Sequence, residues 1–178
     1  MDALRSCARL NSRIRWLRIA LVVLATCGIA QLSAAETTLH TLTGTGSQTV
    51  TGPALTLVTF EGGETSLDLT VDVASSVAIY FSGECTVSAP DDTTWLDVDI
   101  RVDGVALAPT SGNNAFCTSE SVSSLSRGWQ SGSADAVGTL SPGTHTIDVS
   151  AALMSATSSD QWRMGETTLF AIVMGGGA

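Results

Sequence analysis

Lysine is absent from this 178-residue chain, and all eight of its basic residues are arginines. Five of these arginines fall within the first 18 residues, so the rest of the chain holds three arginines against 16 acidic residues, a net charge of −13. Nucleic-acid binding needs clustered lysine and arginine side chains. The shortage of positive charge therefore argues against a nucleic-acid partner, while the acidic surface favours solubility and attracts divalent cations.

The sequence also lacks an apolar run long enough to span a membrane, which takes about 20 residues. The run at 19–30 is shorter, follows the arginine-rich start and precedes the small residues 33–35. This pattern is typical of a secretory signal peptide. We expect residues 1–35 to be the signal and 36–178 to form a single domain that is secreted to the periplasm, the cell surface or the medium. A retained membrane anchor and lipid attachment at Cys27 are the alternatives.

Cysteines are few, and only Cys85 and Cys117 lie beyond the leader. Two cysteines in an exported domain predict one disulfide bond. It would close a loop of about 33 residues, and such a bond contributes roughly 3 to 4 kcal/mol. The two histidines lie far from both cysteines in the sequence, and neither cysteine belongs to a C-x-x-C pair, so a zinc site is not expected.

Helical periodicity is missing after residue 36, and apolar residues instead recur with a period of two. The segments rich in Val, Thr, Leu and Ile predict strands at 37–43, 55–60, 66–73, 77–82, 95–102, 105–107, 136–140, 145–153 and 166–174. Residues 84–89 either extend the fourth of these strands or form another. Residues 110–133, rich in Ser, Gly and Asn, are expected to be the loosest part of the chain.

The segment 95–102 shows the alternation most clearly, with Leu96 and Val98 predicted to face the core and Asp97 and Asp99 to face water. Asp103 and the glycine after it then form a strong hairpin turn signal. The segment 166–174 is apolar at nearly every position, as in a strand from the middle of a sheet.

Eight to ten short strands with hairpin spacing predict an all-β fold, an antiparallel two-sheet β-sandwich of jelly-roll type. An immunoglobulin-like sandwich is the alternative, because the order Cys85, Trp95, Cys117 matches its Cys-Trp-Cys pattern. Against it, Cys117 lies in a segment rich in Ser and Asn and not in a predicted strand.

The layout of four segments resembles the jelly-roll domains of the C1q and tumour-necrosis-factor type. These segments are VAIYFSGECTV at 77–87, LDVDIRVDGVAL at 96–107, VGTLSPGTHTIDVSAAL at 137–153 and TTLFAIVM at 167–174. Most aromatic positions expected in those families are absent here. The resemblance implies a binding or assembly module of an exported bacterial protein, often trimeric, and it carries over no catalytic residue.

The sequence offers little support for catalysis. There is no G-x-S-x-G motif, and the three-residue spacing of His145 and Asp148 places them on opposite faces of a strand. Asp97 and Asp99 share a strand face at a spacing of about 7 Å, but an exposed acidic face that discourages sheet-to-sheet pairing explains them better. We therefore expect no enzyme activity.

Two binding hypotheses remain. Trp129 and Trp162, beside Arg127 and Gln161, could stack on a sugar and bind its hydroxyls, although the rings could instead cap the ends of the core. For calcium, the cofactor considered, the oxygen-rich candidates are Asp91, Asp92, Asp97, Asp99 and Asp103, without the spacing of an EF-hand.

The sequence thus predicts a secreted, non-enzymatic module for binding or assembly, with a second copy of itself, another surface protein or a glycan as partner. A carbohydrate-binding module is the alternative function.

Overall fold

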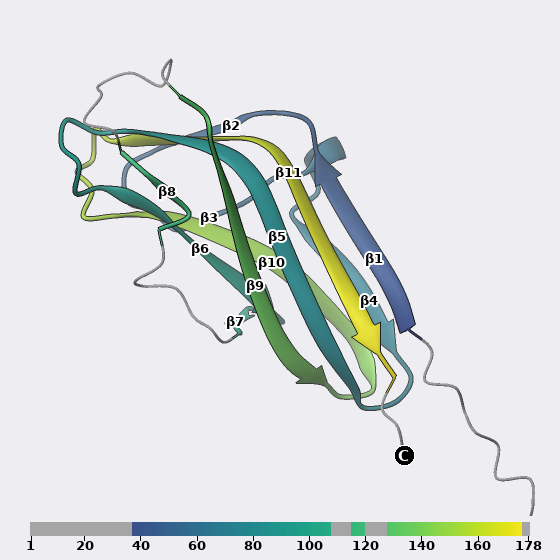
Figure 1. Cartoon of the computed structure of the whole chain (residues 1–178). Coiled ribbons are helices and arrows are strands. Elements are labelled where there is room, and N and C mark those ends of the chain that lie inside the picture. Colours follow the sequence, from purple (N-terminus) through teal and green to yellow (C-terminus); the bar gives the residue numbers. More distant parts are fainter. Residues whose placement is uncertain (1–36, 108–114, 120–127, 176–178) are drawn as a thin grey trace, which may run out of the picture. The chain divides into compact units, whose positions relative to one another are not determined.

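Almost every described residue of the domain belongs to a strand or to a short turn between strands. A computed structural model describes residues 37–107, 115–119 and 128–175 (Figure 1). The predicted signal segment and Arg127 lie outside these residues. The longer strands are β1 (Thr37–Gly44), β4 (Ser66–Val71), β5 (Ser75–Ser88), β6 (Trp95–Val102), β9 (Gln130–Leu140), β10 (Gly143–Met154) and β11 (Gln161–Met174). The shorter elements are β2 (Gln48–Thr51), β3 (Thr56–Leu57), the 3-10 turn η1 (Glu61–Gly63), β7 (Val105–Ala106) and β8 (Cys117–Thr118).

The strands form two antiparallel sheets that are layered against each other (Figure 1). Sheet A has the order β1-β11-β5-β9, with β2 also paired to β11. Sheet B has the order β3-β10-β6-β7, with β4 paired to β10 and β8 to β6. The all-β sandwich predicted from the sequence is thereby confirmed.

The pairing is nested, since early strands pair with late strands in reverse order. β1 pairs with β11, β4 with β10, β5 with β9 and β6 with β7, and each pair is antiparallel. Two further antiparallel pairings, β11 with β5 and β10 with β6, join these strand pairs into the two sheets. That is the strand order of a jelly roll. An immunoglobulin-like sandwich would pair the first strand with the second, whereas β1 pairs with the last.

Alternation builds the core, because every second side chain of a strand points to the same face. Leu96, Val98, Ile100 and Val102 of β6 point inward, as the sequence predicted, and are all buried. At the end of β6, Asp103 and Gly104 have φ values of 52° and 79°, the two positive angles of a type I′ hairpin turn. The largest fully buried side chains are those of Trp162, Phe81, Leu69, Ile79, Leu96, Ile147, Met164 and Leu169.

Several local expectations were wrong. Cys117, expected outside any strand, belongs to β8, and of the strand predicted at 55–60 only Thr56–Leu57 forms one. β9 begins at Gln130, inside the segment expected to be loose, because its backbone pairs with β5 as far as Cys85. The glycines and serines at the start of β9 show no alternation of apolar residues that would predict a strand. Gly132 is required because a Cβ at this position would lie 2.6 Å from the carbonyl oxygen of Phe116. β11 begins at Gln161, five residues earlier than expected. Asp97, expected to face water, is only 6% exposed.

Candidate functional site

The outer face of sheet A carries apolar side chains where an outward face normally carries polar ones. In β11, Leu169, Ala171 and Val173 are buried in the core, while Phe170 and Ile172 alternate with them and point to the other side. A strand that is apolar on both faces is typical of a sheet covered on both sides. Among the described residues, sheet B forms the layer on the inner face of sheet A, and no strand lies over the outer face (Figure 1).

The register aligns these outward residues into rows across the four strands. Leu39, Ile172, Ala78 and Val137 are successive partners on β1, β11, β5 and β9, and we call them the apolar row. Leu39 is 63% exposed and Val137 is 64% exposed. The apolar row therefore presents four aliphatic side chains side by side, with its two ends open to solvent.

An aromatic pair extends the apolar row. Tyr80 and Phe170 are direct cross-strand partners, and their rings stack at 4.9 Å with an interplanar angle of 21°. On the other side of the row lies Met174, which is 43% exposed. In these three rows the one charged residue is Asp135, at the β9 end. We use the name apolar face for Leu39, Ala78, Tyr80, Val137, Phe170, Ile172 and Met174.

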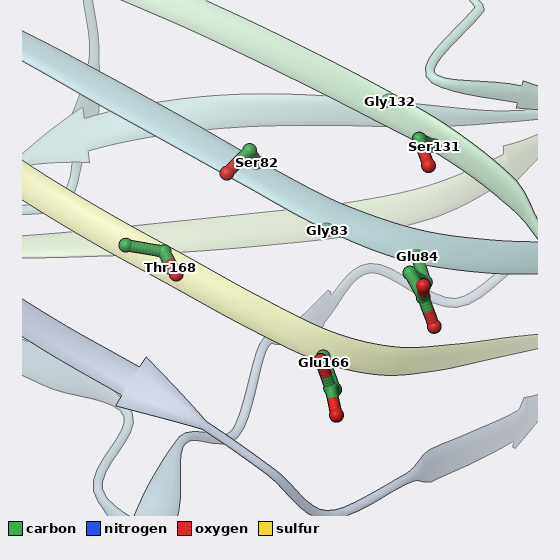
Figure 2. A pocket seen from close by; sticks show the side chains of 7 residues that line it. All are labelled: Ser82, Gly83, Glu84, Ser131, Gly132, Glu166 and Thr168. Atoms are coloured by element: carbon green, nitrogen blue, oxygen red, sulfur yellow. The ribbon is translucent and has the colours of Figure 1, made fainter.

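A polar hollow of about 270 Å³ adjoins the apolar face on the same sheet (Figure 2). It lies where β11 has a bulge: Gly165 and Glu166 stand opposite the single residue Glu84 of β5. The hollow is lined by Ser82, Gly83, Glu84, Ser131, Gly132, Glu166 and Thr168. Its side chains thus include two carboxylates and three hydroxyls, and none carries a positive charge.

Trp129 lies beside this hollow. Its side chain is 45% exposed, and a Cβ at Gly165 would lie 3.0 Å from Cζ3 of the indole, so glycine lets the ring lie close against β11. The guanidinium carbon of Arg163 lies 5.2 Å from the ring centroid, a cation–π contact. Arg163 also donates a hydrogen bond of 3.0 Å to Ser47 Oγ, which fixes the guanidinium under the ring.

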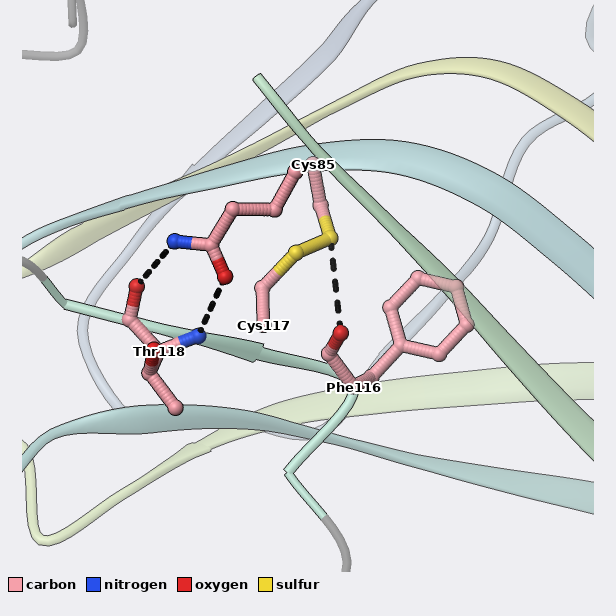
Figure 3. The surroundings of a disulfide bond; sticks show 5 residues. Cys85, Phe116, Cys117 and Thr118 are labelled. Carbon is pink, nitrogen blue, oxygen red and sulfur yellow. Dashed lines mark hydrogen bonds between the residues drawn. A yellow bond between two sulfur atoms is a disulfide. The ribbon is translucent and has the colours of Figure 1, made fainter. Parts of the chain in front are cut away.

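The disulfide bond predicted from the sequence is confirmed, and it joins the two sheets. Cys85 belongs to β5 and Cys117 to β8, with their Cα atoms 6.2 Å apart (Figure 3). Gln130, which follows Trp129, is the β9 partner of Cys85. Its side-chain amide donates to the Thr118 carbonyl at 2.7 Å and accepts from the Thr118 N–H at 3.1 Å. The disulfide bond and the two hydrogen bonds of the Gln130 side chain together hold the backbone next to Trp129 in place.

The structure separates the tryptophans that the sequence grouped. Trp162 lies within β11 and is fully buried, so its ring packs in the core and has no surface for a ligand. Gln161 lies on the same face of β11 as Arg163, roughly 7 Å further along the strand. Arg127 lies outside the described residues.

The acidic residues considered for calcium are spread over different environments. Asp91 accepts hydrogen bonds from the N–H and hydroxyl of Thr93, and these bonds lower the pKa of its carboxyl. Asp92 is exposed in the same turn, whereas Asp97 and Asp99 lie in β6. Within the described ranges, no three His, Cys, Asp or Glu side chains gather closely enough to hold a metal ion.

Asp103 pairs instead with His145, a contact that sequence spacing did not suggest. Its carboxylate accepts from His145 Nδ1 at 2.8 Å and from the Thr146 N–H at 2.9 Å, while Nε2 lies 2.8 Å from the Ser141 carbonyl. The hydrogen bond to Asp103 raises the pKa of His145, and the bond from the Thr146 amide lowers the pKa of Asp103. This arrangement fixes the β9–β10 turn against the β6–β7 turn.

Sequence reasoning missed both the apolar face and the hollow. The sequence did hold one sign of the apolar face, the apolar run at 167–174, which we interpreted only as a strand in the middle of a sheet. The hollow left no signal, because its lining residues come from three strands that pair over long sequence distances.

No family model and no curated protein matches this sequence. Among solved structures, the chain is similar to the VP2 subviral particle of infectious bursal disease virus, with 11% identity, a TM-score of 0.47, and coverage of 80% of this chain and 33% of that one. It is also similar to dimeric latent PorU from Porphyromonas gingivalis, with 10% identity, a TM-score of 0.49, and coverage of 80% and 14%. A family 35 carbohydrate-binding module from Clostridium thermocellum gives 14% identity, a TM-score of 0.34, and coverage of 74% and 97%.

This chain thus spans a third or less of the virus and PorU chains. The fold assignment rests on the strand order and register given above. Among the residues that the structure describes, no helix has the length and apolar character to cross a membrane.

Proposed function

We propose that this chain is an exported, non-enzymatic assembly module, and that a second copy of the chain binds to its apolar face. The observation that carries this proposal is β11, whose residues from Leu169 to Val173 are apolar on both faces although sheet B covers only one. An outward apolar face of this kind marks an interaction surface. Each aliphatic side chain that becomes fully buried there contributes roughly 1.5 to 3 kcal/mol.

The distribution of charge favours a second copy as the partner. The chain is strongly acidic, so most contacts between two copies would bring carboxylates together. The apolar face is nearly free of charge, with Asp135 at its border. A symmetric contact of the apolar face with itself therefore buries apolar surface and adds little repulsion.

Export is supported by two independent features. The arginine-rich and apolar leader has the pattern of a secretory signal. The bond between Cys85 and Cys117 is of the kind that persists in oxidising compartments.

The test is light scattering coupled to size-exclusion chromatography, on the chain expressed with its leader into an oxidising compartment. We expect an oligomer whose mass stays constant on dilution. Val137→Thr should shift it toward the monomer, because it places a hydroxyl in the apolar row. Val105→Thr is the matched control: Val105 is 68% exposed against 64% for Val137, but it lies in β7 of sheet B. A monomer at every concentration would overturn the proposal, as would equal effects of the two variants.

A further inference from the structure

We propose that the hollow and the Trp129 ring together form a binding site for a carbohydrate without negative charge. The two parts are continuous: the ring lies against Gly165, and the next residue, Glu166, lines the hollow. Ser131, two residues after Trp129 on the same chain segment, lines it from the β9 side. An aromatic surface and a set of polar groups thus meet along one edge.

The polar groups of the hollow suit a ligand rich in hydroxyls. The carboxylates of Glu84 and Glu166 come from neighbouring strands and accept hydrogen bonds only, as carboxylates do when ionised (Figure 2). The hydroxyls of Ser82, Ser131 and Thr168 can both donate and accept. Charge-assisted bonds from sugar hydroxyls to the two carboxylates are the strong ones. With no cation among the lining residues, the same carboxylates would repel an anionic sugar.

The ring offers the complementary apolar surface. Sugar rings have apolar faces, and tryptophan supplies a flat surface of matching size. Trp129 keeps 45% of its side chain exposed although Gly165 and Arg163 support it. The hollow, at about 270 Å³, lies at the small end of ligand pockets, which measure about 300 to 1,000 Å³. We infer that the hollow takes one sugar unit of a longer chain and that Trp129 stacks on the next.

Neighbouring residues hold the Trp129 ring in a fixed position, as expected for a preorganised binding surface. Gln130 is clamped to both backbone groups of Thr118, and the neighbouring disulfide ties that segment to β5 (Figure 3). Arg163 is held in turn by Ser47. Fixing a side chain in its binding geometry reduces the entropy lost when the ligand binds.

The experiment measures tryptophan fluorescence and isothermal titration calorimetry on the full chain. The probes are cellohexaose and chitohexaose, both neutral, together with an oligogalacturonate of the same length. We expect at least one neutral hexasaccharide to bind and to change the emission, and the oligogalacturonate not to bind. Trp129→Ala and the double variant Glu84→Gln, Glu166→Gln should each weaken binding by about tenfold or more.

Three further variants separate loss of the site from loss of the fold. In Gly165→Ala the indole remains but the new methyl group displaces it, so binding should weaken while the near-ultraviolet spectrum keeps its folded signal. Val105→Thr, in β7 of sheet B and outside both the hollow and the apolar face, should bind as the parent does. Val137→Thr should also bind normally, which makes the result independent of the proposed self-association.

The proposal is overturned if neither neutral hexasaccharide binds, or if binding survives unchanged in Trp129→Ala.

Discussion

The outer faces of the two sheets differ although the sheets share one core. On sheet A, the outer face holds the apolar row and the Tyr80–Phe170 stack, with Thr41 and Asp135 at the ends of the row that holds the stack. On sheet B, the outward positions of β4 and of the first half of β10 are polar: Thr70 and Thr144 share a hydrogen bond of 3.0 Å, and the Thr146 hydroxyl donates to Asp68 at 3.3 Å. Sheet B therefore follows the usual alternation of core and solvent faces, whereas sheet A departs from it.

The outer face of sheet B also holds a partly buried ion pair. Arg101 Nε lies 3.3 Å from Asp148 Oδ1, and their side chains are 24% and 11% exposed. Burial raises the pKa of Asp148, and the Arg101 charge opposes this rise. The comparison shows that an outward position does not fix the polarity of a side chain. The outer face of sheet A is apolar at one end and carries Glu84 and Glu166 at the other, whereas the outer face of sheet B is polar and partly buries the pair of Arg101 and Asp148.

The largest expected effect comes from the bond that joins the two sheets. Replacing both cysteines, Cys85→Ala with Cys117→Ala, should lower the free energy of unfolding by about 3 to 4 kcal/mol. The bond joins residues that are 32 positions apart, and without it the unfolded chain gains conformational entropy. Chemical denaturation under oxidising conditions measures this. Each single variant should lose nearly as much as the double variant, because either one removes the bond. A loss below about 1 kcal/mol would contradict the prediction.

The second prediction tests the charged face. Arg101→Met leaves the Asp148 carboxylate without its partner. Because Arg101 is partly exposed and solvent screens the pair, the free energy of unfolding should fall by about 1 to 3 kcal/mol at neutral pH. Because the folded-state pKa of Asp148 is already raised above 3.8 and would rise further, the folded form binds its proton more readily than the unfolded form. The loss should therefore shrink as the pH falls from neutral toward 3.8.

Denaturation curves at several pH values check this, with the double variant Arg101→Met, Asp148→Leu as the control. The double variant should recover most of the lost stability, because no unpaired charge remains buried. If Arg101→Met lowers the free energy of unfolding by the same amount at every pH, an unpaired Asp148 carboxylate is not the cause of the loss.

The third prediction places the same new charge on each face. Leu39→Lys puts an ammonium into the apolar row, and Thr144→Lys puts one on the outer face of sheet B. Both sites are exposed, so each change should alter the free energy of unfolding by within about 0.5 kcal/mol. Only Leu39→Lys should reduce self-association, as measured by sedimentation velocity. If both variants dissociate the oligomer equally, the two faces do not differ in the way described.

The smallest expected effect concerns the His145–Asp103 pair at the end of the sandwich. The pKa of His145 is raised by its hydrogen bond to Asp103, so its stabilising contribution is complete below pH 6.5 and disappears as the pH rises through the folded-state pKa. The pKa of Asp103 is lowered, so its contribution is present above pH 3.8 and fades on acidification. His145→Gln should remove the slope near neutral pH in a stability–pH profile. An unchanged slope in that variant would exclude His145 as its source.

Local patterns predicted much of the fold. The alternation of β6 correctly assigned Leu96 and Val98 to the core, and the turn at Asp103 formed as its sequence requires. The second half of β9 was predicted as the strand at 136–140, but the first half escaped prediction. Residues 130–133 are glutamine, serine and glycine, and what makes them a strand is their pairing with β5. Of the two candidate tryptophans, Trp162 became core and Trp129 surface, a difference that their similar polar neighbours did not reveal.

The sequence by itself determined the class of fold, the hairpin at Asp103 and the single pair of cysteines after residue 35. These depend on neighbours along the chain or on simple counting. The tertiary structure decided that Leu39, Ala78, Val137 and Ile172 form one row, and that Glu84 and Glu166 share a hollow beside Trp129. Such groupings depend on the register between strands that are distant in sequence, and a shift of one residue would turn each side chain to the opposite face.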